Sequence, residues 1–123
     1  MSFPTNGWRE RVATAANDDE QFGVAAEQFD GSVTFEVGDE VAWFKIYRGS
    51  VIDTEPYVPP FGTTFRITGE QSAWTELLED GRSFSEQIYA GRLRTAGNKL
   101  EANRMREATE LLVRCLRRQE GRA

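Results

Sequence analysis

Few side chains of this 123-residue chain are suited to chemistry. The chain has no histidine and one cysteine, Cys115. Without histidine there is no Ser-His-Asp or Cys-His nucleophile pair, no imidazole base near neutral pH and no histidine ligand for zinc. A single cysteine also excludes an intramolecular disulfide. The sequence therefore excludes most familiar hydrolase mechanisms.

The remaining candidates for an acid or a base are Asp53, Glu55 and Tyr47. In a partly dry site their pKa values would shift, and they would then serve a small enzyme acting on an apolar substrate. Carboxylates on a short strand more often face solvent, and we favour that interpretation for Asp53 and Glu55. We expect no catalytic residue and keep the enzyme as an alternative.

Neither a metal nor a cofactor is expected. The acidic cluster Asn17-Asp18-Asp19-Glu20 lacks the alternate spacing of oxygen ligands around a glycine turn that a Ca²⁺ loop requires. Asn and Asp side chains bond to the nearby backbone, so the cluster instead predicts a break between two helices. The chain has no G-x-G-x-x-G segment after a predicted strand and no phosphate-binding loop of the G-x-x-x-x-G-K type.

Charge is distributed unevenly along the chain, whose net charge is −5 and whose pI is near 4.8. Residues 1–40 carry nine acidic and two basic side chains, net −7, whereas residues 82–123 carry ten basic and five acidic, net +5. We interpret these segments as solvated faces of ends that dock together. The alternative is a basic patch in transient contact with anionic lipid headgroups at a membrane surface. Nucleic acid is not an expected partner, because the net charge is negative and acidic residues interrupt the basic segment.

The length predicts a single domain, because separate cores need roughly 50 residues or more each. No apolar run approaches the ~20 residues that cross a bilayer, and residues 1–8 have no leader, so we expect a cytoplasmic location. Apolar periodicity divides this domain, residues 1–123, into five parts. They are N-terminal helices in 1–29, four strands in 32–68, helices in 70–90, a fifth strand in 92–96 and a long C-terminal helix over 98–118.

Local signals support these elements. The alternation in 33–37 predicts a strand with one buried face, and a turn at 38–39 joins it to an antiparallel partner over 41–47. In that partner Phe44 and Ile46 face inward and Trp43 faces the other side. For the helices, three caps are predicted: Thr5 or Asn6 for the first, the capping box Ser83-Phe84-Ser85-Glu86 for the fourth, and Asn98 for the last.

The segment from Trp74 to Asn98, W-T-E-L-L-E-D-G-R-S-F-S-E-Q-I-Y-A-G-R-L-R-T-A-G-N, together with the order of elements, resembles the sterol carrier protein type 2 (SCP2) family of lipid-binding domains. The resemblance extends from about Val33 to Leu116. It implies an α+β domain in which helices cover a five-stranded antiparallel sheet. It also implies an apolar tunnel between sheet and helices for lipids, fatty acyl chains or sterols.

The sequence is rich in bulky apolar residues, with eight Phe and three Trp, and this surplus could line such a pocket. We therefore expect a carrier, without catalytic activity, of a hydrophobic small molecule such as a lipid, a fatty acyl chain or a sterol-like or isoprenoid-like compound. The expected ligand-binding residues are Phe35, Phe44, Ile46, Phe61, Phe65, Ile67, Trp74, Leu78, Phe84, Ile88 and Leu112.

Two alternatives explain the same surplus without a cavity. The aromatic residues could fill a solid core, which is the usual fate of such side chains in proteins. They could also form the interface of a homodimer, or of an accessory subunit that delivers an apolar substrate to an enzyme. In that case Trp43, Tyr47 and the loop segment Pro59-Pro60-Phe61 are the expected contact residues.

Overall fold

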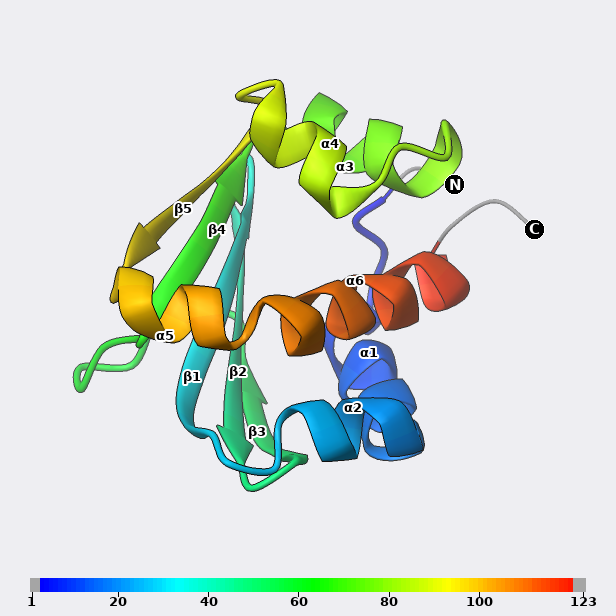
Figure 1. Ribbon diagram of the computed structural model, residues 1–123. Helices are drawn as coiled ribbons and strands as arrows, with labels where there is room; N and C mark the ends of the chain where they lie inside the picture. The colour runs from blue at the N-terminus through cyan, green and yellow to red at the C-terminus, as the bar shows by residue number, and fades with distance from the viewer. Residues whose placement is uncertain (1–2, 121–123) are drawn as a thin grey trace.

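The computed structural model describes residues 3–120, so the ends of the predicted domain, 1–2 and 121–123, lie outside the described residues. Its fold is α+β, as predicted, with one five-stranded sheet and the helices on one side of it (Figure 1). The elements in chain order are α1 (Trp8–Asn17), α2 (Glu20–Ala25), β1 (Asp30–Val37), β2 (Glu40–Tyr47), β3 (Ser50–Glu55), β4 (Phe65–Gly69), α3 (Gln71–Glu79), α4 (Phe84–Tyr89), β5 (Leu93–Gly97), α5 (Lys99–Arg104) and α6 (Arg106–Glu120).

The acidic cluster separates α1 from α2, as its composition predicts. Asp19 is the N-cap of α2, and its carboxylate accepts hydrogen bonds from the backbone N–H groups of Gln21 and Phe22 at 2.9 and 3.2 Å. The same carboxylate pairs with Arg114 of α6 at 2.8 Å. The acidic N-terminal segment therefore docks against the basic C-terminal helix, as the charge pattern predicts.

The start of α1 differs from the prediction. Its N-cap is Gly7, in the left-handed region with φ of 77°, and neither Thr5 nor Asn6 caps the helix through its side chain. The Thr5 hydroxyl is bonded instead to the carboxylate of Glu120 at the end of α6. A contact between residues far apart in the chain thus replaces the local cap, which sequence patterns alone do not reveal.

The sheet has the strand order β3-β2-β1-β4-β5, and one of its pairs corrects the expectation of an antiparallel sheet. β1 and β4 are parallel, with Val33 opposite Phe65, while the other three pairs are antiparallel. The reason is the connection over 56–64, which returns along the sheet before β4 begins. A strand entered after such a crossover runs in the same direction as the strand before it.

The two faces of the sheet differ in what covers them. Val33, Phe35 and Val37 of β1 are buried in the core beneath the helices. On the opposite face, the loop 56–64 lies over Trp43, which is only 1% exposed and meets Phe61 edge to face at 5.6 Å. The predicted division of β2, with Phe44 inside and Trp43 on the other side, is therefore confirmed.

The predicted single helix over 98–118 is wrong in one respect, because it is two helices that meet at Met105. Asn98 does cap the first of them, accepting a hydrogen bond from the N–H of Glu101 at 3.0 Å. Met105 is buried, whereas Leu100 is 69% exposed. The break lets α5 pack on β4 and β5 while α6 packs on α1, α2 and α3. No helix within residues 3–120 is long and apolar enough to span a membrane.

Candidate functional site

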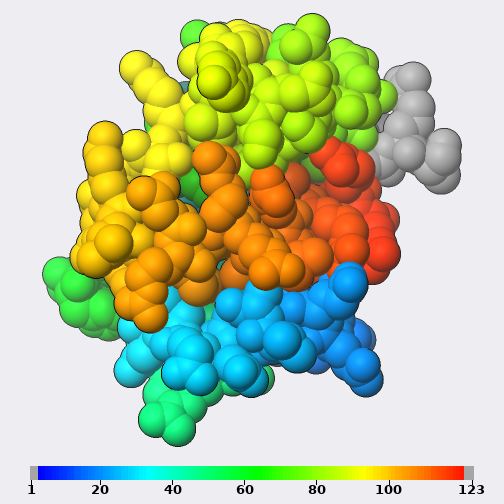
Figure 2. Space-filling view, in the orientation of Figure 1, coloured from blue at the N-terminus to red at the C-terminus, as the bar shows by residue number. Residues whose placement is uncertain are grey.

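A pocket of about 130 Å³ lies between the sheet and the helices at the β5 end of the molecule. Its buried lining consists of Phe65 and Ile67 of β4, Phe84 of α4 and Thr109 of α6. The space-filling view faces its mouth, a hollow between the yellow residues of α4 and β5 and the orange residues of α5 (Figure 2). The rest of the lining is half-buried or exposed and comprises Thr95, Lys99, Ala102, Asn103 and Arg106.

Local structure explains why these side chains converge. Alternation in β4 turns both Phe65 and Ile67 toward the helices. Phe84 is the first residue of α4, and the predicted capping box fixes the start of that helix. In this box the Ser83 hydroxyl accepts a hydrogen bond from the N–H of Glu86 at 3.0 Å, and the Glu86 carboxylate accepts one from the N–H of Ser83 at 2.9 Å. Phe65 and Ile67 of β4 and Phe84 of α4 thus converge on the pocket.

The opposite wall is a row of side chains that crosses the break between α5 and α6. Ala102, Arg106 and Thr109 follow one another at spacings of four and three residues, which places them on one side of the helical segment. The break at Met105 leaves this row facing β4 and β5. None of Ala102, Arg106 and Thr109 was among the predicted ligand-binding residues, so this row was missed.

The polar groups of the pocket are mostly donors. Lys99 and Arg106 contribute two cations, and the lining contains no acidic residue. Among residues 3–120, neither cation has a carboxylate partner, and the Arg106 guanidinium instead lies 5.5 Å from the centre of the Phe84 ring. The hydroxyl of Thr109, a residue only 4% exposed, has no hydrogen-bond partner within the part of the chain that the structure describes.

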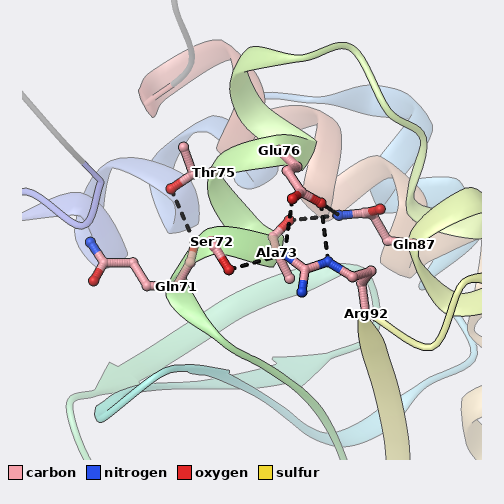
Figure 3. A network of polar contacts seen from close by, with 7 residues as sticks. All are labelled: Gln71, Ser72, Ala73, Thr75, Glu76, Gln87 and Arg92. Carbon is pink, nitrogen blue, oxygen red and sulfur yellow. Dashed lines mark hydrogen bonds and ion pairs between the residues drawn. The ribbon is translucent and has the colours of Figure 1, made fainter.

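A polar cluster beside the pocket holds α3, α4 and the start of β5 together (Figure 3). Arg92 donates to both carboxylate oxygens of Glu76, at 2.9 and 3.2 Å, and to the Ser72 hydroxyl at 3.0 Å. Buried Gln87 donates to the same carboxylate at 3.1 Å and to the carbonyl of Ala73 at 2.8 Å. These hydrogen bonds hold the pKa of Glu76 below its ordinary value, and the bond from Arg92 has the largest effect. These bonds join α4 to α3 and to Arg92, and so hold α4 and its first residue, Phe84, in position. The cluster of Ser72, Glu76, Gln87 and Arg92 is called the clamp below.

The structure divides the eleven predicted ligand-binding residues into three groups. Phe65, Ile67 and Phe84 line the pocket. Phe61 is 77% exposed and lies on the other face of the sheet, against Trp43, so it does not line this pocket. The remaining residues are in the core or packed against it: Phe35, Phe44, Ile46, Trp74, Leu78, Ile88 and Leu112.

The candidate acids and bases are not brought together with the pocket. Asp53 and Glu55 belong to β3, the edge strand at the far side of the sheet from β5, and Tyr47 belongs to β2. The Asp53 carboxylate accepts a hydrogen bond from the N–H of the next residue, and none of the three side chains lines the pocket. Burial raises the pKa of the Cys115 thiol, which keeps it protonated and poorly nucleophilic. Within residues 3–120, no group of three or more carboxylate or thiol side chains is placed to hold a metal ion.

The fold and the pocket define a class of protein: an α+β domain with one mixed sheet, helices on a single face, and a small pocket with an apolar floor between the two layers. Comparison with known proteins gives this class a name. No family model matches the sequence, and no curated protein does. Solved structures do match.

A crystal structure of sterol carrier protein 2 superimposes with a TM-score of 0.79 at 20% identity, covering 92% of this chain and 95% of that one. A conserved hypothetical protein of Thermus thermophilus, described as possibly a sterol carrier protein, gives 0.79 at 19% identity, with coverages of 99% and 92%. The ubiquinone synthesis protein UbiJ-SCP2 gives 0.60 at 17% identity, with coverages of 91% and 95%. The chain therefore has an SCP2-like fold, which confirms the resemblance seen in its sequence. Identities this low establish the fold alone.

Proposed function

We propose that this protein is a non-catalytic carrier of a hydrophobic small molecule, which it holds between the sheet and α4, α5 and α6. The observation that carries the proposal is the pocket itself, with a buried apolar floor of Phe65, Ile67 and Phe84. Its position between sheet and helices and the SCP2-like fold support it, since the similar structures include proteins named as sterol carriers. Small-molecule sites typically combine apolar side chains with convergent polar groups, and this pocket has an apolar floor with polar groups around its mouth.

The size of the pocket limits what it encloses. Its volume of about 130 Å³ is close to that of an engineered apolar cavity of about 150 Å³ that binds benzene. The pocket as it stands therefore takes one ring or a short alkyl segment, and a longer ligand extends out of the mouth. Burying about 200 Å² of apolar ligand surface contributes roughly 5 kcal/mol before association costs, so the dissociation constant is expected to be about 0.2 mM or weaker.

The first test uses protein purified from its expression host. Native mass spectrometry before and after extraction with organic solvent is expected to show an apolar small molecule that extraction removes. The second test places toluene in the pocket and follows backbone amide shifts by NMR. Shifts are expected at Thr95, Ala102 and Thr109, which line it.

A matched pair of variants locates the binding. Ala102 and Ala15 are both half-buried and packed against the core, but only Ala102 lines the pocket. Ala102→Leu fills the space and is expected to abolish toluene binding, whereas Ala15→Leu retains it. Binding that survives in Ala102→Leu, or a wild-type protein that takes up neither toluene nor a host molecule, would contradict the proposed function.

An interaction subunit is a second candidate, favoured by the loop over the opposite face of the sheet. There Phe61 is 77% exposed, and Tyr57 and Pro60 are exposed beside it. Exposed aromatic residues close together are typical of protein interfaces. Light scattering of wild type and Phe61→Ser tests this candidate: a wild-type dimer that the substitution dissociates supports it, and a wild-type monomer contradicts the homodimeric form.

A further inference from the structure

The loop between β3 and β4 presents an aromatic side chain to the outside in a fixed position. The N–H of Gly62 donates to the carbonyl of Pro59 at 2.8 Å, which closes a β-turn with Pro60 and Phe61 at its centre. Proline restricts the backbone of this turn, and the Phe61 ring packs edge to face on Trp43 at 5.6 Å. Phe61 is nevertheless 77% exposed. A large apolar side chain is therefore held in place without being buried.

A carboxylate lies on the same face of the sheet as the residue that supports this ring. Glu55 is opposite Trp43 in the register of β3 with β2, so the two side chains project from the same face. Within residues 3–120, Glu55 has no salt-bridge partner. Phe61 and Glu55, which are called the knob below, thus combine an exposed apolar ring with an unpaired negative charge.

The pocket between the sheet and the helices has the opposite charge and a matching size. Its floor is apolar, and Lys99 and Arg106 in its lining have no carboxylate partner among the described residues. Its volume of about 130 Å³ is close to that of a cavity of about 150 Å³ that takes up benzene, which is the ring of a phenylalanine side chain. Knob and pocket are therefore complementary in size, apolar character and charge.

The knob and the pocket of one molecule cannot meet each other. Phe61 packs on Trp43 on the face of the sheet that the helices leave open, whereas the pocket lies on the helix-covered face. Two knobs are also poor partners, because a contact between them would bring two Glu55 carboxylates together, and like charges facing each other disfavour an interface. The surface that fits the knob is therefore the pocket of a second copy.

We infer that this protein self-associates by inserting Phe61 of one copy into the pocket of another, with Glu55 facing Lys99 and Arg106. The contact joins two different surfaces, so it is heterologous and continues to further copies unless the arrangement closes. Phe61 and a small molecule need the same space, so the empty protein associates and the loaded protein separates. This competition rests on the proposed function, whereas the contact itself does not.

Sedimentation velocity tests the contact with protein that an apolar resin has freed of bound molecules, its unliganded mass being checked by native mass spectrometry. Small interfaces give weak, transient complexes, so reversible association with a dissociation constant of about 100 µM is expected. Phe61→Ser is expected to weaken it at least about tenfold. Val24→Ser is the control, because Val24 is 70% exposed on α2 and belongs to neither surface, and it is expected to associate as the wild type does.

A mixture of two variants shows which surfaces meet. Ala102→Leu fills the pocket and keeps the knob, whereas Phe61→Ser keeps the pocket and lacks the ring, so neither is expected to self-associate. Mixed together they are expected to form a complex within about threefold of the wild-type dissociation constant, because one supplies the knob and the other the pocket. Ala15→Leu leaves the pocket open and is expected to self-associate normally.

A reversal of charge tests the electrostatic part. Glu55→Lys places a cation against Lys99 and Arg106 and is expected to weaken self-association about fivefold. Asp18→Lys makes the same change at an exposed residue outside both surfaces and is expected to have no effect. Equal losses in the two variants would overturn the assignment of Glu55.

Toluene separates the inference from the proposed function. At about ten times its dissociation constant it is expected to weaken self-association about tenfold, because it competes for the pocket. A wild type that binds toluene but stays monomeric throughout the concentration series would overturn the inference and leave the proposed function intact. Self-association that persists in Ala102→Leu, or a mixture of the two variants that fails to associate, would also overturn it. Self-association of a protein that takes up neither toluene nor a host molecule would support the contact and contradict the proposed function.

Discussion

The helix-covered face of the sheet has two halves that are packed differently. Near β2 and β1, Phe35 meets Phe44 at 5.5 Å and Trp74 at 5.1 Å between ring centres. The Trp74 indole N–H donates to the carbonyl of Glu36 at 3.0 Å, so this half is filled and its buried indole is satisfied. Near β4 and β5, Phe65, Ile67 and Phe84 line the pocket together with polar side chains, and the Thr109 hydroxyl has no partner in residues 3–120.

The difference lies in the helices and not in the side chains. At one end of the sheet the ten-residue helix α1 packs on β3, whereas the pocket end is covered by α4 and α5, which have six residues each, and by the start of α6. Because α5 ends where Met105 turns the chain, it cannot close over Phe65 and Ile67 as a continuous helix would. An aromatic-rich sequence therefore yields a solid core under long helices and a pocket where short helices leave a gap.

The largest expected effect is a difference between the two halves in the free energy of unfolding that is lost when an aromatic ring is removed. Phe35→Ala removes a ring from the filled half and is expected to lower the free energy of unfolding by about 4 kcal/mol. Phe84→Ala enlarges a pocket that already exists, so its expected cost is smaller, about 2 kcal/mol. Urea unfolding followed by circular dichroism measures both. Equal losses would mean that the two halves are packed alike.

A smaller effect is expected at two buried threonines. Thr109→Val replaces an unpartnered hydroxyl with a methyl group and is expected to raise the free energy of unfolding by about 1 kcal/mol. Thr34, on the opposite face of the sheet, donates to the Thr63 hydroxyl at 2.8 Å, and Thr34→Val is expected to cost about 1 kcal/mol. Chemical denaturation of both variants without ligand checks the signs. A loss at position 109 would indicate that its hydroxyl already has a partner in the free protein.

The smallest effect concerns acid stability at the clamp beside the pocket. The bond from Arg92 lowers the pKa of Glu76, so the clamp contributes stability above the unfolded value of about 4.3 and loses it as the pH falls through the lower folded value. The carboxyl range of pKa values lies between about pH 3 and about pH 6. When the pH is lowered across this range, the wild type is therefore expected to lose more stability than Glu76→Gln does. Thermal unfolding at the two pH values measures the difference. Parallel losses in both proteins would show that Glu76 does not titrate with the fold.

Much of the fold followed from local pattern. Alternation placed Phe44 and Trp43 on opposite faces of β2, and the spacing of Ser83 and Glu86 identified a cap that the structure contains. Both depend on residues within a few positions of each other, where geometry is set by the backbone period. The parallel pairing of β1 with β4 did not follow, because it depends on the path of a loop whose direction no residue pattern specifies.

The candidate site was predicted only in part, for the same reason. Phe65, Ile67 and Phe84 were recognised as inward apolar residues, as were Phe35 and Trp74, which turned out to lie in the filled core. Nothing in their types separates the two groups. The polar lining residues between Lys99 and Thr109 were not predicted, although the excess of basic residues after position 82 pointed to this part of the chain.

The sequence by itself determined most of the order and type of the elements, the absence of histidine chemistry and the inward faces of β1, β2 and β4, because these depend on residue identity and local period. Only the tertiary structure decided where the apolar surplus leaves a cavity and which polar groups surround it. Those features depend on how far α5 extends before Met105 turns the chain, and on which long-range partners satisfy each buried group. A cavity is the space that packing fails to fill, so it appears only when all the packed elements are in place.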